Sequence, residues 1–187
     1  MISEAVTVLA EIILLVNTWM KENSLMLNSE KTELFLVHKK SFSVSDKLTI
    51  TILDKTIEFR TSGTFRWLGI DIDSELKMDE FVTRTCSSCY GALRMLRRIR
   101  KGLNMQSIIM LCHSLVISRI DYCSSILCGV NRYNYQRLQR VMNLCVRIIF
   151  QTKRFDHLTP LFMELKWINI EKNPQKNCHN HMESFKN

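Results

Sequence analysis

The spacing of apolar residues changes once along this chain, and the change limits the folds that the chain can adopt. Before residue 79 several short runs alternate at period two, as in Leu48-Thr49-Ile50-Thr51-Ile52. From Asp79 onward apolar residues recur every three to four positions, and Pro is absent as far as residue 150. Period two is typical of half-buried strands and a period of 3.6 of amphipathic helices. The sequence therefore predicts an α+β protein, with an N-terminal helix and a small antiparallel sheet followed by an all-helical bundle.

The segment before residue 48 is expected to hold one helix and one strand. Residues 3–23 have helical spacing, with Ser3 as the N-cap. Residues 34–38 form a short apolar run suited to a buried strand.

The next segment reads as a hairpin and a further strand. The alternating runs at 48–52 and 57–59 flank a turn at Asp54-Lys55, which predicts a hairpin. Residues 64–73 are expected to form one strand, in which Gly69 indicates a bulge or a close backbone approach.

The helical part is predicted to contain three long helices and a short one. The long helices cover residues 79–101, 105–128 and 132–150, with breaks that begin at Gly102 and Gly129. The short helix lies near residues 160–165. We expect three regions: the helix-and-sheet region at 1–78, the helical region at 79–170 and a poorly ordered polar tail at 171–187.

The positive charge of the chain is concentrated in the helical part. Of the net charge of +8, residues 81–155 hold 13 basic residues against one acidic residue, Asp121. Residues 1–80 are net acidic, with 13 acidic and 9 basic residues. A block of one sign attracts a polyanion far more strongly than a mixed surface does. Nucleic acid is the leading class of partner, and an anionic membrane surface is the second.

Cysteine usage and the N-terminal segment indicate where the protein resides. The chain has seven cysteines, an odd number, and six of them are scattered through the predicted helices, which is typical of a reduced intracellular protein rather than a secreted disulfide scaffold. The apolar run at 5–16 is interrupted by Glu11 and is too short to span a bilayer. We expect a nuclear or cytoplasmic protein with neither a signal peptide nor a transmembrane segment.

The predicted helix at 79–101 has one apolar face and one cationic face. The cationic face carries four residues spaced i, i+3, i+4 and i+7, namely Arg94, Arg97, Arg98 and Lys101. A solvated face usually mixes both signs, whereas this face holds no acid, so contact with a polyanion is the preferred interpretation and a merely solvated face the alternative. Arg137, Arg140 and Arg147 of the third long helix extend this surface, unless part of their face packs through Leu144.

Three groups of metal-ligating side chains have simpler interpretations. Cys86 and Cys89 fall on the apolar stripe of the first long helix, which favours core thiols over half of a zinc site. Cys178, His179 and His181 supply three ligands in a spacing that matches no zinc knuckle. Asp71 and Asp73 share one side of a strand, but acids are common where a strand enters a turn. We expect no cofactor and no metal in this chain.

Several successive segments resemble, in order and approximate spacing, the end of the reverse transcriptase domain of jockey-like non-LTR retrotransposons. The resemblance covers about residues 3–170. The matching segments are Trp19-Met20-Lys21-Glu22-Asn23, Leu27-Asn28-Ser29-Glu30-Lys31-Thr32-Glu33, Trp67-Leu68-Gly69-Ile70-Asp71-Ile72-Asp73, Leu96-Arg97-Arg98-Ile99-Arg100, Ser118-Arg119-Ile120-Asp121-Tyr122-Cys123, Arg137-Leu138-Gln139-Arg140-Val141, His157-Leu158-Thr159-Pro160 and Leu165-Lys166-Trp167.

The resemblance implies roles for particular residues. The 28–33 segment corresponds to polymerase motif D, whose lysine, here Lys31, assists departure of pyrophosphate; an ordinary exposed lysine is the alternative. Trp67, Leu68 and Gly69 correspond to motif E, the primer grip, and core filling is the alternative for Trp67. The helices from residue 79 onward correspond to the thumb.

The catalytic aspartates that hold two Mg²⁺ ions in the parent enzyme belong to earlier palm segments, which have no counterpart here. The chain alone is therefore predicted to be inactive, with an RNA–DNA hybrid and the missing upstream palm and fingers as its partners. Its sheet is expected to present an unpaired edge and an uncovered apolar face. The alternative functions are a basic helical adaptor that binds an acidic protein or an anionic membrane, and a small intact enzyme.

Overall fold

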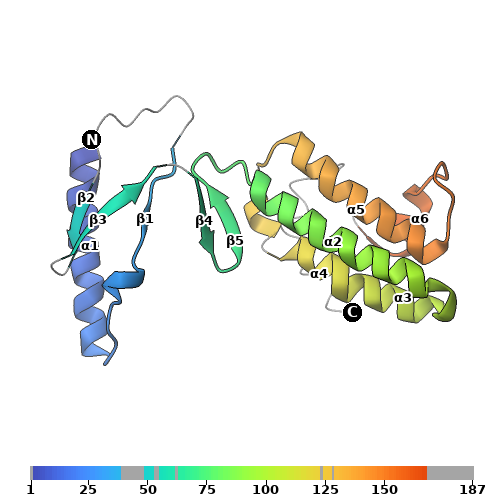
Figure 1. Cartoon of the computed structure of the whole chain (residues 1–187), viewed down its shortest axis with the longest axis horizontal. Coiled ribbons are helices and arrows are strands. Elements are labelled where there is room, and N and C mark those ends of the chain that lie inside the picture. The colour runs from blue at the N-terminus through green and yellow to red at the C-terminus, as the bar shows by residue number, and fades with distance from the viewer. Residues whose placement is uncertain are drawn as a thin grey trace. The chain divides into compact units, whose positions relative to one another are not determined.

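The computed structural model describes residues 2–38, 49–52, 55–61, 63–122, 124–127 and 129–167. The protein is a mixed α/β chain with two small sheets and a predominantly helical C-terminal part (Figure 1). It divides into two compact units. The first comprises residues 1–67 and 73–76, and the second residues 68–72 and 77–187. The predicted tail at 171–187 lies outside the described residues.

The first unit is a long helix packed on a three-stranded sheet. Helix α1 covers Ile2–Glu22, as predicted, and the sheet has the strand order β1 (Leu34–Phe35), β3 (Lys55–Arg60), β2 (Thr49–Ile52). A one-turn 3₁₀ helix at Ser29–Lys31 precedes β1. The small core of this unit consists of Leu34, Ile50 and Ile57, against which the inner face of α1 packs through Val6, Leu9, Ala10 and Ile13.

The sheet of this unit is mixed, and the prediction of an antiparallel sheet is correct only for the hairpin. Strands β2 and β3 pair antiparallel, with Ile50 opposite Ile57, whereas β1 runs parallel to β3. Strand β1 is also shorter than the predicted 34–38. Beyond it the N–H of Leu36 still donates to the Arg60 carbonyl at 3.0 Å, but that of His38 donates to the Ser74 carbonyl at 2.8 Å. The chain thus leaves β3 after Leu36.

The prediction of one strand over residues 64–73 is wrong, because the backbone reverses in its middle. Strand β4 (Thr64–Trp67) and strand β5 (Ile70–Asp73) form the second sheet, a hairpin with Leu68 and Gly69 as the turn. Their φ angles are +48° and +84°. Two consecutive residues with positive φ are what a tight two-residue hairpin turn of type I′ requires. Gly69 therefore marks a turn rather than a bulge.

The second unit contains the predicted long helices. Helix α2 covers Asp79–Ile99 and is followed by a 3₁₀ turn at Arg100–Gly102, and α5 covers Arg132–Phe150. Asn104 and Asn131 cap α3 (Met105–Cys112) and α5, since their side chains accept hydrogen bonds from the N–H groups of Ser107 (2.7 Å) and Asn134 (2.9 Å). Helix α6 covers Thr159–Glu164, next to the predicted 160–165.

The middle helix is shorter than the predicted 105–128. It runs as α3 (Met105–Cys112), a π-helical turn (His113–Ile117) and α4 (Ser118–Asp121). It ends because Tyr122 has a ψ of 114°, outside the helical range, and a separate 3₁₀ turn follows at Ser124–Leu127. The Tyr122 hydroxyl donates to the Leu68 carbonyl at 2.6 Å, which fastens this end of the helix to the hairpin turn.

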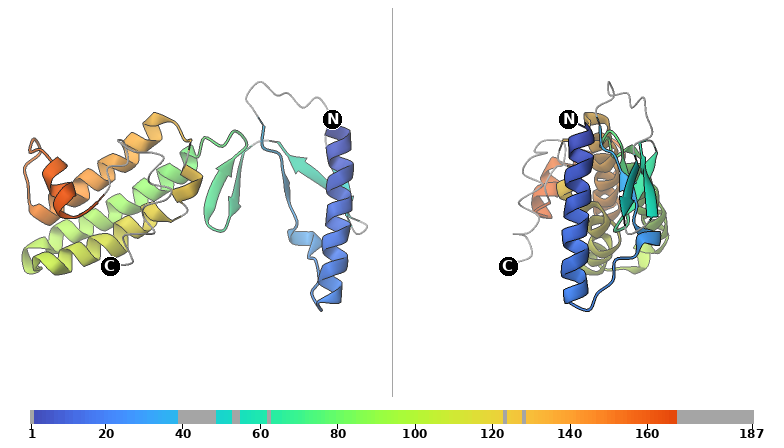
Figure 2. Two further views of the ribbon diagram at one scale, coloured as in Figure 1. Left: turned by 180° about the vertical axis from the view of Figure 1, so that it is seen from behind. Right: turned by 90° about the vertical axis from the view of Figure 1, so that its left-hand side faces the viewer.

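Helices α2 and α5 lie side by side and run in the same direction (Figures 1 and 2). Near their beginnings the Asn134 side chain donates to Asp79 Oδ1 at 2.7 Å and to the Lys77 carbonyl at 3.1 Å. Near their ends the Arg100 guanidinium donates to the carbonyls of Ile148 (2.9 Å), Ile149 (2.7 Å) and Leu103 (2.9 Å). Between these two links lies the main core, which includes fully buried Leu93, Leu96, Leu138, Val141 and Ile149.

Replacing Arg100 with Met should destabilise this unit, because the partly buried carbonyls of Ile148 and Ile149 would lose a charged donor. Such a loss costs about 2–3 kcal/mol. We expect the free energy of unfolding, measured by urea denaturation, to fall by that amount. Arg98→Met is the matched control, since Arg98 is an exposed arginine two residues earlier, on α2, and makes no such bond within the described residues. Equal effects of the two substitutions would contradict the role of Arg100.

Candidate nucleic-acid interface

Helix α2 separates its apolar and cationic residues as the sequence predicts. The stripe formed by Val82, Cys86, Cys89, Leu93 and Leu96 is buried in the core. Arg94, Arg97, Arg98 and Lys101 are all exposed. Within the part of the chain that the structure describes, none of these four is paired with a carboxylate. Their charges are therefore available to a ligand.

The basic residues of α5 divide between packing and solvent. Arg140 is exposed, whereas Arg137 is half-buried and donates to Thr83 Oγ1 of α2 at 2.8 Å and to Asn134 Oδ1 at 3.3 Å. Arg147 is also half-buried, and its guanidinium donates to the Lys153 carbonyl. Arg137 thus joins α2 to α5 as well as contributing charge at their surface.

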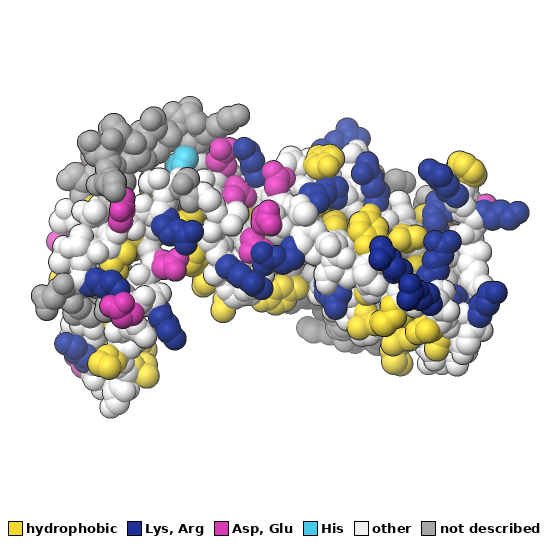
Figure 3. All heavy atoms as spheres, in the orientation of Figure 1, with side chains coloured by type: hydrophobic (Ala, Val, Ile, Leu, Met, Phe, Trp, Pro, Cys, Tyr) yellow, Lys and Arg dark blue, Asp and Glu magenta, His cyan; other side chains and the backbone are white. Residues whose placement is uncertain are grey.

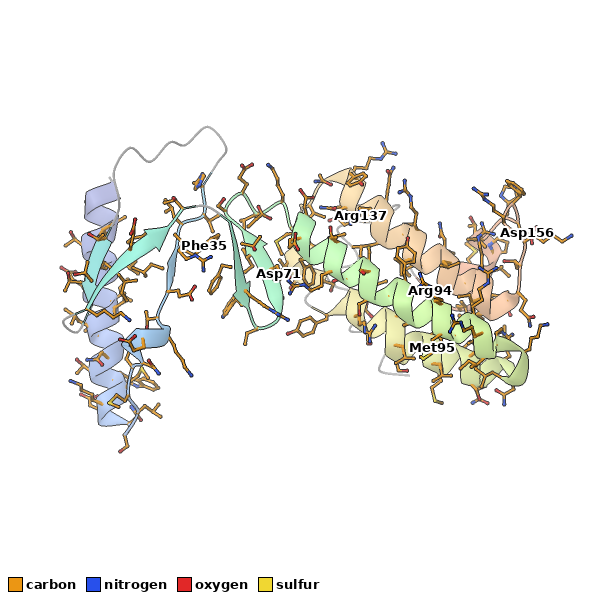
Figure 4. All side chains as sticks on the ribbon, viewed as in Figure 1. Phe35, Asp71, Arg94, Met95, Arg137 and Asp156 are labelled. Atoms are coloured by element: carbon orange, nitrogen blue, oxygen red, sulfur yellow. The ribbon has the colours of Figure 1, made fainter. Side chains whose placement is uncertain are left out.

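The parallel course of α2 and α5 brings their basic residues onto one surface. Arg94 and Arg137 both lie along the line where the two helices meet (Figure 4). Lys and Arg side chains gather over α2 and α5 in the space-filling view, where acidic side chains are sparse (Figure 3). We call the set Arg94, Arg97, Arg98, Lys101, Arg137 and Arg140 the basic face.

Two tyrosines lie on the basic face and were not identified from the sequence. Tyr90 of α2 is 38% exposed and Tyr133 of α5 is 60% exposed. The Arg137 guanidinium lies 5.6 Å from the centre of the Tyr133 ring. Partial burial raises the pKa of Tyr90, and the charges of Arg140 and Arg137 act in the opposite direction. Each tyrosine lies four residues before an arginine, Arg94 or Arg137. This spacing places the two side chains on one side of a helix, and it could have identified the tyrosines from the sequence.

The predicted primer-grip residues lie at the hairpin between β4 and β5. Trp67 is 55% exposed and Leu68 is 73% exposed, so core filling does not explain Trp67. A shallow hollow of about 330 Å³ beside Gly69 is lined by residues that include Arg84, Arg119 and Tyr122. The Arg119 guanidinium donates to the backbone carbonyl of Ser88 at 3.1 Å.

Lys31 belongs to the first unit, away in sequence from the basic face. It ends the 3₁₀ turn at Ser29–Lys31, and its side chain is exposed. The Asn28 side chain accepts hydrogen bonds from the N–H groups of Glu30 (3.1 Å) and Lys31 (3.2 Å), which fixes the backbone of this turn.

The two strand carboxylates have structural partners. Asp71 Oδ2 lies 2.8 Å from Arg84 Nη1, an ion pair that joins β5 to α2, and the Asp71 side chain is only 4% exposed (Figure 4). Asp73 Oδ1 accepts a hydrogen bond from the N–H of Glu75 at 3.1 Å. Among the described residues no cluster of three or more metal-ligating side chains occurs.

Cys86 and Cys89 are core thiols, as predicted. Both are buried, and burial raises the pKa of Cys89 to about 11. Cys112 and Cys145 are buried as well, and a hydrogen bond between their side chains, together with burial, raises the pKa of Cys145. Cys178, His179 and His181 lie outside the described residues.

Comparison with protein-family models, with curated proteins and with solved structures finds no match to this chain. The described helices include none whose length and apolar character would allow it to cross a membrane.

The raised pKa of Cys89 predicts how stability depends on pH. The folded value of about 11 lies above the ordinary value of 9.0, so the contribution of this thiol is fully present below pH 9 and is lost as the pH rises toward 11. The loss approaches about 1.4 kcal/mol per pH unit. Urea unfolding across this window should show a shallower decline for Cys89→Ala than for the natural chain. Identical declines would place the thiol in water rather than in the core.

Proposed function

We propose that this chain forms the end of the palm and the thumb of a non-LTR retrotransposon reverse transcriptase, and that its basic face holds the template–primer hybrid. The observation that carries the proposal is the pairing of two basic helices in parallel, with exposed cations that no described carboxylate neutralises. The resemblance in the sequence supplies the polymerase context. The proposal makes the chain a binding part of that enzyme rather than its reactive centre.

The dimensions of the basic face suit a nucleic-acid backbone. With a rise of 1.5 Å per residue, the cations from Arg94 to Lys101 extend over about 10 Å, and packed helices lie about 8–10 Å apart. Duplex nucleic acid carries one negative charge per ~1.7 Å of its axis. A surface of this size therefore faces several phosphates at once. The phosphates would contact Arg94, Arg97, Arg98, Lys101 and Arg140 first, because these are exposed, whereas Arg137 is half-buried.

The partly exposed tyrosines add a second kind of contact. Aromatic rings stack on bases or sugars and do so without regard to sequence. Tyr90 and Tyr133 lie among the cations of α2 and α5, as the burial and charge contacts of Tyr90 and the Arg137–Tyr133 pair indicate. Phosphate contacts and ring stacking are both independent of sequence. They therefore suit a polymerase, which must bind a template–primer hybrid of any sequence.

Under the same proposal the hairpin turn at Trp67, Leu68 and Gly69 is the primer grip. The exposed side chains of Trp67 and Leu68 support this role, since a primer terminus needs a flat surface to pack against. Lys31 would stand near the departing pyrophosphate, where a cation stabilises developing negative charge. The carboxylates that hold Mg²⁺ would come from the upstream palm of the parent enzyme.

An exposed apolar face on α1 supports a partner for the first unit. Val8, Ile12, Leu15 and Trp19 are spaced i, i+4, i+7 and i+11, and each is between 48% and 70% exposed. A stripe of this size on a helix normally packs against protein. In the parent polymerase this stripe would pack against the upstream palm, the missing partner that the resemblance implies.

The affinity of the chain for an RNA–DNA hybrid should fall steeply with salt. If Arg94, Arg97 and Arg98 of α2 and Lys101 of the 3₁₀ turn each contact a phosphate, counterion release gives a slope of log K against log[salt] of about −3 to −4. Arg94→Gln should reduce the slope by about 0.9. Lys21→Gln is the matched control, because Lys21 is an exposed cation on α1 and should leave the slope unchanged. Fluorescence anisotropy with a labelled hybrid measures both.

Two results would contradict the proposal. One is hybrid binding that does not depend on salt, and the other is an equal change in slope for Arg94→Gln and Lys21→Gln. Flotation with anionic liposomes separates the alternative of a membrane-surface adaptor. Recovery of the chain with the liposomes, in competition with the hybrid, would favour that alternative.

A further inference from the structure

The helical unit contains a hollow that the sequence did not indicate. It lies where α2 and α5 both end, and its volume is about 460 Å³. Its lining includes five cationic side chains from two distant parts of the sequence, namely Arg97, Arg100, Lys101, Arg147 and Arg154. No acidic side chain is among the described residues that line it. We call this site the basic hollow.

Two arginines of the basic hollow are held in position by hydrogen bonds to backbone carbonyls. Arg100 donates to the carbonyls of Ile148, Ile149 and Leu103, which uses three of the five N–H donors of its guanidinium. Arg147 donates to the Lys153 carbonyl and so closes the turn after α5. Two of the five cations are thus fixed in place before any ligand arrives, which lowers the entropic cost of binding.

The charge in the basic hollow exceeds what the helix ends can neutralise. Cations near a helix C-terminus often serve only to offset its dipole, and this is the simplest explanation for such a cluster. Each C-terminus carries roughly half a negative charge, so two parallel helices supply about one. Five cations line the hollow. About four positive charges therefore remain, and an anion would relieve their mutual repulsion.

The carboxylate next to the hollow does not neutralise it. Asp156 lies in the turn after α5 (Figure 4), and its Oδ2 accepts a hydrogen bond from the N–H of Lys153 at 2.7 Å. That bond directs the carboxylate to the backbone of the turn. Asp156 is not among the residues that line the hollow.

Thr152, a residue of the hollow's wall, carries a hydroxyl that lies beneath the surface. The Thr152 Oγ1 atom is buried without a hydrogen-bond partner among the described residues. Buried polar atoms in native proteins nearly always have a partner, so an unpartnered one indicates a water or a ligand. The arginines of the same wall suit a phosphate, because a guanidinium binds two phosphate oxygens at once.

We propose that the basic hollow binds a phosphate group that carries at least two negative charges, such as pyrophosphate or the terminal phosphate of a nucleic-acid strand. Arg97, Lys101 and Arg154 contact the phosphate oxygens, and Arg100 and Arg147 supply fixed charge. The apolar parts of Leu144 and Ile148 in the lining limit competition from water. This site goes beyond the binding of a hybrid backbone by the basic face, because it takes a compact dianion without a duplex.

Pyrophosphate binding to the full chain, measured by isothermal titration calorimetry at constant ionic strength, tests the proposal. The double variant Arg97→Gln/Arg154→Gln should weaken binding about a hundredfold or more, since it removes two charge-assisted hydrogen bonds to the phosphate. The matched control is Arg94→Gln/Arg98→Gln, which removes two exposed arginines of α2 that do not line the hollow. It should bind pyrophosphate as the natural chain does.

Equal weakening by both double variants would overturn the proposal, because it would indicate general charge attraction. The absence of pyrophosphate binding would also overturn the proposal. If the same preparation still bound the hybrid in a salt-dependent way, the proposed function of the basic face would not be affected. Oligonucleotides with and without a 5′-phosphate identify the source of the group. Competition by the phosphorylated strand alone assigns the site to strand ends, and competition by neither assigns it to the free anion. Equal competition by both would contradict a site for dianions.

Discussion

The parallel packing of α2 against α5 is the constraint on which the second unit depends. Helices joined by short loops usually run antiparallel, and here α3 and α4 lie between α2 and α5 in the sequence and carry the chain back, so that α5 can start beside the beginning of α2. Buried Asn134 fixes the two beginnings and Arg100 fixes the two ends. Polar contacts at both ends specify a direction and a register that the apolar core between them would leave open.

This direction has two consequences for the surface. The basic residues in the later part of α2 come to lie beside those of α5, so that residues more than 35 positions apart in the sequence form one face. The two helix C-termini also fall at the same end, where their carbonyls attract cations. The basic face and the basic hollow therefore both result from the parallel packing of α2 and α5. An antiparallel α5 would have moved its basic residues away from those of α2 at both sites.

Features with a local cause could be predicted from the sequence. The 3.6-residue period defined α1, α2 and α5, and the apolar stripe of α2 placed Cys86 and Cys89 in the core. The division of charge located the basic residues. Features set by distant partners could not be predicted. The parallel pairing of β1 with β3 and the end of α4 at Tyr122 depend on contacts with residues far away in the sequence.

Two further features could not be predicted from the sequence, namely the turn at Leu68 and Gly69 and the basic hollow. Leu is rare at positive φ, so the pattern of residues 64–73 favoured one continuous strand over the observed hairpin. The hollow unites Arg97 and Lys101 with Arg147 and Arg154, and no spacing rule connects these pairs. Arg137, which the sequence assigned to the basic surface, is only half exposed, because its guanidinium also donates a hydrogen bond to Thr83.

The most direct test of a nucleic-acid-binding face is to locate the bound strand. An RNA–DNA hybrid that carries 5-bromodeoxyuridine can be cross-linked to the chain by ultraviolet light, and the attached peptides identified by mass spectrometry. We expect cross-links in α2 and α5, with Tyr90 and Tyr133 foremost, and their loss at high salt. Cross-links confined to α1 and the first sheet, or a pattern that high salt leaves unchanged, would contradict the account.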